Sequence, residues 1–167
     1  MNRWHRAWRH IICGNAQLRR HFPRAALQAI EQAVKRLEGR HPGEIRFAVE
    51  AALPIADVLA GVTPRERAIE VFSRLRVWDT EHNNGVLIYV LLADRDVEIV
   101  ADRGVAGGRV AASEWEAVCR GMEQAFREGR FEAGAIAGLE AAAEVLARHP
   151  PGRPDVGNEL PDAPVVL

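Results

Sequence analysis

Apolar side chains recur at helical spacing in four segments of the chain. The i, i+3, i+4, i+7 pattern runs through residues 23–38, 63–75, 113–128 and 131–149. Thr63 and Pro64 supply an N-cap and a proline at the first helical position of the second segment. Ser113 and Glu116 have the spacing of a capping box at the start of the third. The pattern therefore predicts four helices.

Three shorter segments have the pattern of β-strands, namely residues 44–50, 86–93 and 97–101. The first alternates apolar and polar side chains, as expected of a strand with one face in water. The second is continuously apolar, which is typical of a strand covered on both faces. The turn between the last two is so short that they must form an antiparallel hairpin. Strands flanked by helices predict an α/β fold, a three-layer α/β/α sandwich with a small mixed sheet.

A chain of 167 residues is long enough for one domain and too short for two ordinary ones. We divide it into a basic amphipathic N-terminal segment (1–22), an α/β/α domain (23–149) and an irregular tail rich in proline and glycine (150–167). No apolar run approaches the roughly 18 residues of a membrane helix. Cys13 and Cys119 are expected to be unpaired thiols in a reducing compartment, so we expect a cytoplasmic protein.

Charge is distributed unevenly, although the formal net charge is only -1. Residues 1–24 contain only basic charges, all of them arginines, so the rest of the chain carries the excess of acids. An acidic body argues against nucleic acid as a partner, because phosphate affinity comes from clustered Lys and Arg. Nothing in the sequence indicates an oligomeric state.

The N-terminal segment admits two interpretations. Trp4 and Trp8 fall on one side of a basic amphipathic helix, and such helices can lie at a membrane interface. Residues 1–20 would then attach the protein to a membrane surface or a membrane protein, making it peripheral to the membrane. The alternative is a helix that packs against the body of the protein or frays at the terminus.

Polar residues suited to a divalent cation gather in the loop that precedes the apolar strand. Carboxylate and amide oxygens are the ligands that Ca²⁺ prefers, with Mg²⁺ as the alternative ion. The loop does not match the EF-hand template, so further ligands would have to come from other loops. The candidate ligands are Asp79, Asn83 and Asn84 in the loop and Asp57, Asp94 and Asp102 elsewhere. The competing interpretation is a capped turn in solvent.

Two further positions bear on phosphate chemistry. Arg103 follows the last strand and can hold a phosphate in a bidentate manner, with Gly104 allowing close backbone approach; the alternative is an exposed ion pair. Asp94 and Asp96 follow an apolar strand, as the nucleophile of an aspartyl phosphatase does. We reject that role, because a hairpin leaves no room for a crossover helix and no lysine follows, and we expect a solvated turn there.

The run Asn83-Asn84-Gly85-Val86 before an apolar strand resembles the TPM domain family. A second strand ending near Gly104 and a closing helix that begins Phe131-Glu132-Ala133-Gly134 belong to the same pattern. The resemblance covers roughly residues 23–149. It implies an α/β/α sandwich, and it implies relatives described as acid phosphatases or as factors in photosystem II repair, some with calcium in a groove.

Carried over by position, the resemblance points to groove residues for metal and phosphate. They are Asp79, Asn83 and Asn84, with Asp102 and Arg103 beside them. Arg103, Asn83 and Asn84 are the expected phosphate ligands, and no catalytic residue is identified. Two functions are therefore open. One is a weak metal- or phosphate-binding groove with phosphomonoester hydrolysis, and the other is a non-enzymatic interaction module that assists membrane-protein assembly or quality control.

Overall fold

The computed structural model describes residues 3–41, 43–106, 109–150 and 157–167. In chain order the elements are α1 (Arg3–Ile12), α2 (Asn15–His21), α3 (Arg24–Glu38), β1 (Glu44–Glu50), α4 (Ile55–Ala60), α5 (Pro64–Arg74), β2 (Gly85–Leu91), β3 (Asp96–Ala101), α6 (Arg103–Ala106), α7 (Ala112–Arg127), α8 (Phe131–Arg148) and β4 (Val165–Val166). None of the helices in these ranges is long and apolar enough to cross a membrane.

The strands form one mixed sheet in the order β3-β2-β1-β4. β1 and β2 run parallel, with Glu44 opposite Gly85. β2 and β3 are antiparallel, which confirms the predicted hairpin. β4 pairs in parallel with β1. This strand lies in the segment 150–167, which was expected to be irregular, so the prediction is wrong for these two residues. Val165 and Val166 pair with the free edge of β1.

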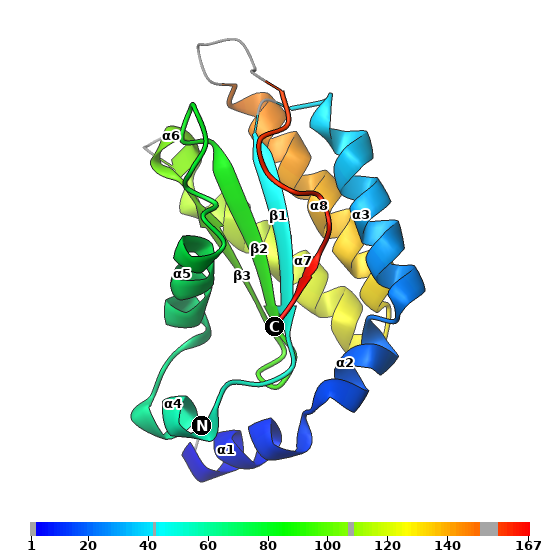
Figure 1. Ribbon diagram of the computed structural model, residues 1–167, viewed down its shortest axis with the longest axis vertical. Helices are drawn as coiled ribbons and strands as arrows, with labels where there is room; N and C mark the ends of the chain where they lie inside the picture. The colour runs from blue at the N-terminus through cyan, green and yellow to red at the C-terminus, as the bar shows by residue number, and fades with distance from the viewer. Residues whose placement is uncertain (1–2, 42, 107–108, 151–156) are drawn as a thin grey trace.

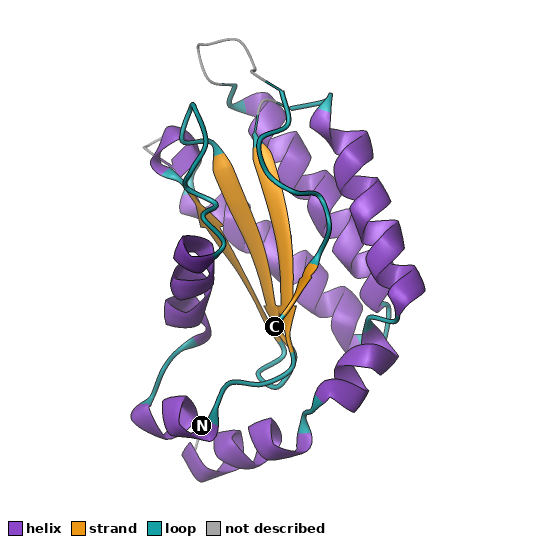
Figure 2. Cartoon of the chain, viewed as in Figure 1, coloured by secondary structure: helices purple, strands orange, loops and turns teal. Residues whose placement is uncertain are grey.

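Helices cover both faces of the sheet, as Figures 1 and 2 show, and the predicted α/β/α sandwich is confirmed. α3, α7 and α8 pack on one face around Phe47, Ile88 and Leu139. α5 packs on the other around Leu87 and Tyr89, and α4 and α1 lie at the end of that layer. The sheet thus has one end near α6 and the other near α1 and α4.

β1 was expected to have one face in water, yet all seven of its residues are buried. Its polar side chains have partners that the alternation could not show. Glu50 accepts two hydrogen bonds from Arg67, from Nε at 2.9 Å and Nη2 at 2.8 Å. It also accepts one at 2.6 Å from the hydroxyl of Tyr89. Arg46 donates to the carbonyl oxygens of Pro161 and Ala163 in the C-terminal tail.

Helix starts were predicted unevenly. Thr63 caps α5 as predicted: its hydroxyl oxygen accepts from the Glu66 N–H at 3.1 Å. The capping box at Ser113 and Glu116 is wrong, because α7 begins earlier, with Ala111 as its N-cap and no side-chain cap. β3 is followed by the short helix α6, which begins at Arg103.

Candidate functional site

Two segments that are separated by 16 residues in the sequence meet at the α6 end of the sheet. We call residues 79–85 and 102–104 the Asn83–Arg103 corner. The Gly104 N–H donates to the Asn83 carbonyl oxygen at 2.9 Å, and the Asp102 N–H donates to that of Gly85 at the same distance. A Cβ at Gly104 would lie 2.3 Å from the Asn83 carbonyl oxygen, so only glycine permits this approach.

The loop itself is held by internal hydrogen bonds. The Asn84 N–H donates to the Thr80 hydroxyl oxygen at 3.0 Å, and Asn84 is only 3% exposed. Asn83 is half-buried and has a φ of 50°, in the left-handed region that asparagine adopts more readily than most residues other than glycine. The Glu81 N–H donates to the Glu159 carboxylate at 2.9 Å, which ties the loop to the tail. The corner is therefore preformed.

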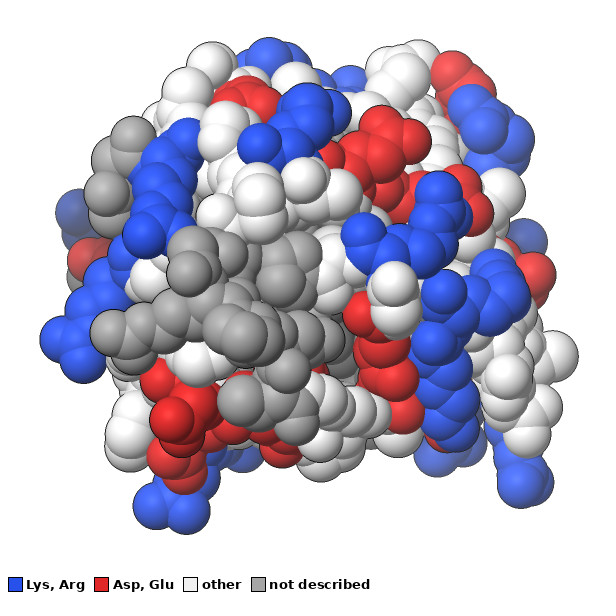
Figure 3. All heavy atoms as spheres, turned by 90° about the horizontal axis from the view of Figure 1, so that it is seen from above, with Lys and Arg blue, Asp and Glu red and all other residues white. Residues whose placement is uncertain are grey.

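Asp102 and Arg103 supply the charge of the corner. Arg103 is exposed, and its Nη2 donates to the Asn83 side-chain oxygen at 3.3 Å. One oxygen of Asp102 accepts from the Arg103 N–H at 2.7 Å. The other, Oδ2, is buried and has no hydrogen-bond partner among the residues that the structure describes. Basic and acidic side chains are interspersed over this end of the molecule (Figure 3), so an anion here would meet individual arginines instead of a broad basic field.

Of the six predicted metal ligands, four fall within the two segments of the corner, and the other two, Asp57 and Asp94, lie elsewhere. Asp79, Asn83, Asn84 and Asp102 all belong to the corner, although Asp79 is exposed. Asp57 lies on α4 at the opposite end of the sheet (Figure 1). Within the described ranges no three His, Cys, Asp or Glu side chains are placed to hold a metal ion.

The hairpin turn is solvated at Arg95 but not at Asp94, so the expectation of a solvated turn is wrong for Asp94. The Asp94 side chain is 6% exposed because α1 covers it. Arg6 donates to Asp94 from Nη2 at 2.7 Å and from Nε at 3.0 Å, and Nη2 of Arg9 lies 3.8 Å away. Asp96 is half-buried beside a cavity of about 400 Å³, and burial, with Glu98 and Glu123, raises its pKa to about 6.

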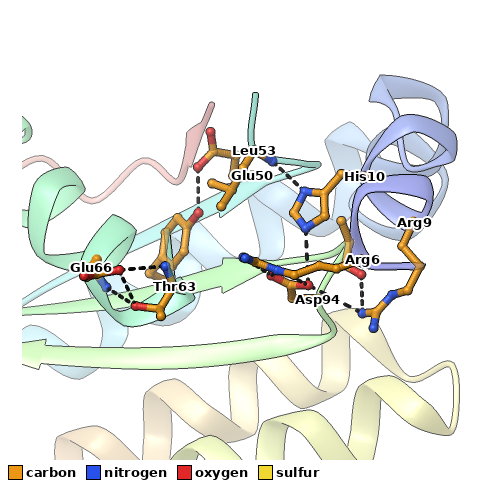
Figure 4. A network of polar contacts seen from close by, with 10 residues as sticks. Arg6, Arg9, His10, Glu50, Leu53, Thr63, Glu66 and Asp94 are labelled. Carbon is orange, nitrogen blue, oxygen red and sulfur yellow. Dashed lines mark hydrogen bonds and ion pairs between the residues drawn. The ribbon is translucent and has the colours of Figure 1, made fainter. Parts of the chain in front are cut away.

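His10 completes the cluster (Figure 4). The Leu53 N–H donates to Nδ1 of His10 at 2.9 Å, so the ring proton of the neutral imidazole sits on Nε2, which lies 3.2 Å from Oδ1 of Asp94. Burial lowers the pKa of His10, against the opposing effect of the Asp94 charge. Burial acts to raise the pKa of Asp94, but its bonds and charge interactions with Arg6 and His10 bring the net pKa down. We call Arg6, Arg9, His10 and Asp94 the α1 latch.

Local sequence gave no signal for the α1 latch, because Arg6 and Asp94 are 88 residues apart. The uneven charge distribution was the one indication in the sequence. Residues 1–24 contain arginines and no acidic residue, so any ion pair they form must be with an acid later in the chain.

Comparison with known proteins agrees with the fold and with the resemblance at Asn83–Val86. The family model of the TPM domain matches residues 19–145. The chain is similar to the BA42 protein of the psychrophilic bacterium Bizionia argentinensis, whose structure was determined by NMR. The two are 30% identical with a TM-score of 0.69, and the alignment covers 86% of this chain and 93% of that one. A search of functionally curated proteins gave no match. The chain therefore belongs to the TPM domain family.

Proposed function

We propose that the Asn83–Arg103 corner binds the phosphate group of a phosphomonoester. The observation that carries the proposal is the placement of an exposed guanidinium beside a side-chain amide by a contact that only Gly104 allows. Arginine presents a planar fork of donors that matches two phosphate oxygens. Because the loop is already held by its own hydrogen bonds, binding requires little ordering of the backbone. One exposed arginine gives weak affinity, with a dissociation constant on the order of 1 mM.

Phosphomonoester hydrolysis is the finer form of this proposal. In it Arg103 and Asn83 bind and orient the phosphate, and Arg103 also stabilises the negative charge that develops during transfer. A bound Ca²⁺ or Mg²⁺ would supply a Lewis acid for a phosphoryl oxygen. We assign no step to such an ion. The support for hydrolysis is the family resemblance, together with the convergence of these residues.

The test is chemical-shift mapping of the ¹⁵N-labelled full chain with inorganic phosphate and with p-nitrophenyl phosphate. We expect shifts at the amides of Asn83, Asn84 and Gly104, and at least a five-fold loss of affinity in Arg103→Gln. Arg120→Gln is the matched control, because Arg120 is an exposed arginine whose ion pair lies within α7. Shifts that are absent, or that persist unchanged in Arg103→Gln, would overturn phosphate binding.

Hydrolysis needs a separate readout, namely release of p-nitrophenol with and without added Ca²⁺ or Mg²⁺. We expect slow turnover that falls in Arg103→Gln and not in Arg120→Gln. Phosphate-dependent shifts without any turnover would leave phosphate binding in place and eliminate the enzyme. Turnover that is equal in all three proteins would identify a contaminant.

A second candidate function is an interaction module that assists membrane-protein assembly or quality control. The observation that favours it is the exposure of large apolar side chains on α1, which include Trp8 at 61%. The check is the share of full-length protein recovered with cell membranes. We expect that share to fall in Trp8→Ser and to be unchanged in Ile69→Ser, where Ile69 is an exposed apolar residue of α5. Equal recovery of both variants would contradict this candidate.

A further inference from the structure

α1 lies on the protein with its polar side inward. Arg6 and His10 face Asp94, and the His10 side chain is fully buried (Figure 4). The large apolar residues of the helix are exposed: Trp4 at 74%, Trp8 at 61%, Ile11 at 60% and Ile12 at 54%. At 100° per residue, Trp4, Trp8 and Ile11 fall within one narrow stripe on the side away from Arg6. A surface helix of a globular protein normally buries that stripe.

The α1 latch explains how this orientation is kept. If the helix turned its apolar stripe inward, Arg6 and His10 would move away from the Asp94 carboxylate. Because the Asp94 side chain is only 6% exposed, its charge would then be buried without its partners. Two further contacts hold the end of the helix. Arg9 donates to the Ala93 carbonyl oxygen, and the sulfur atom of Cys13 lies 3.2 Å from the Ala51 carbonyl oxygen. The apolar stripe is therefore presented to the outside by the fold.

The charged side chains on α1 and α2 themselves are all basic. Residues 3–24 contain no acidic side chain, and Arg3, Arg19 and Arg20 are exposed on α1 and α2. An anionic lipid surface complements this combination, because aromatic and aliphatic side chains enter the boundary between headgroups and acyl chains while arginines bind the headgroups. A second copy of the chain is a poorer occupant, since a two-fold contact through α1 would bring the same basic residues face to face.

We infer that α1 docks this protein on an anionic lipid bilayer, with Trp4, Trp8 and Ile11 in the interface and the neighbouring arginines on the headgroups. This inference rests on the second candidate function, for which it names the partner, and does not depend on phosphate binding. The Asn83–Arg103 corner lies at the opposite end of the sheet from α1 (Figure 1). A docked molecule would therefore hold the corner away from the bilayer.

The test is co-sedimentation of the full chain with vesicles of phosphatidylcholine alone or with 30% phosphatidylglycerol added. We expect binding to the anionic vesicles that weakens in 0.5 M NaCl, because salt screens the arginines. Trp4→Ser combined with Trp8→Ser should lower the partition coefficient at least ten-fold. Arg3→Gln should lower it about five-fold, the value of one basic residue near an anionic surface. Ile69→Ser and Arg103→Gln are controls for an exposed apolar residue elsewhere and for the corner.

Three outcomes would overturn the inference. The first is that the chain does not bind anionic vesicles. The second is that the double tryptophan variant, with an unchanged circular dichroism spectrum, binds as well as the parent. The third is a dimer in analytical ultracentrifugation that the double variant abolishes while no vesicle binds, because the stripe would then be an interface between copies. Because Arg103→Gln is expected to leave vesicle binding unchanged, this experiment tests membrane docking independently of phosphate binding.

Discussion

Replacement of Asp94 by Asn is expected to release α1 without unfolding the sandwich. The change keeps the shape of the side chain but removes the charge that Arg6 and His10 share. An asparagine can accept through one oxygen only, and its amide group would present hydrogens to the guanidinium and imidazole donors. Arg6 would then sit in a site where it is 15% exposed without a counter-ion.

The magnitude follows from the burial of the two partners. Removing one partner of a buried ion pair destabilises by about 3–5 kcal/mol. Arg6 keeps some exposure and can turn toward water, so we expect the lower part of this range or somewhat less, about 2–3 kcal/mol. At 1.4 kcal/mol per factor of ten, this corresponds to a roughly 30- to 150-fold rise in the population of detached α1.

Hydrogen exchange measured by NMR is the assay, because it reports α1 and the strands separately. In Asp94→Asn the amides of α1 should exchange faster by that factor while those of β2 keep their rates. The pKa of His10, which the Asp94 charge now holds up against burial, should fall further. Glu31→Gln, which removes an exposed ion pair within α3, is the control and should change stability by about 0.5 kcal/mol or less. Exchange in α1 no faster than in this control would refute the reasoning.

Three other changes have expected outcomes. Gly104→Ala should destabilise the protein by about 1–3 kcal/mol in thermal unfolding, because the new Cβ would overlap backbone oxygen atoms of the loop. The same change should abolish the phosphate-dependent chemical shifts at the corner. An unchanged melting temperature would contradict the tight contact. Tyr89→Phe removes a buried hydrogen bond to the charged Glu50 and should cost about 1.5–3 kcal/mol in urea unfolding, whereas a neutral result would show that the hydroxyl contributes nothing. Burial and the nearby Asp162 raise the pKa of Glu38 to about 7, so protonation of Glu38 stabilises the fold fully below pH 4.5, and this contribution is lost as the pH rises through 7. Glu38→Gln should therefore flatten the fall in the urea midpoint between pH 5 and 8. An unaltered pH profile would assign the dependence to another group.

The core of the fold could be predicted from the sequence because periodicity is a local property. The apolar run at residues 86–93 and the short turn after it were sufficient to place β2 and the hairpin. β4 could not be found in the same way, because two valines carry no period and pair only where β1 leaves an edge open. Glu50 similarly was expected to face water, since its partners Arg67 and Tyr89 come from α5 and β2.

The candidate site was predicted in part for the same reason. Asn83 and Asn84 stood out through loop composition, and Arg103 lies beside Asn83 in the structure, as the family resemblance implied. Asp57 was included only for its residue type, and the topology places it at the other end of the sheet. Helical spacing showed which residues of α1 share a face. It could not show that the polar face is the buried one, because that depends on Asp94.

The most direct measurement is the orientation of α1 in solution, determined from nuclear Overhauser effects in the full-length protein. We expect contacts from the His10 imidazole protons to the Leu53 amide, and Trp8 indole protons without contacts to the strands or to α5. Contacts from Trp8 or Ile11 to the body of the protein, with His10 in solvent, would contradict the orientation of α1 described above.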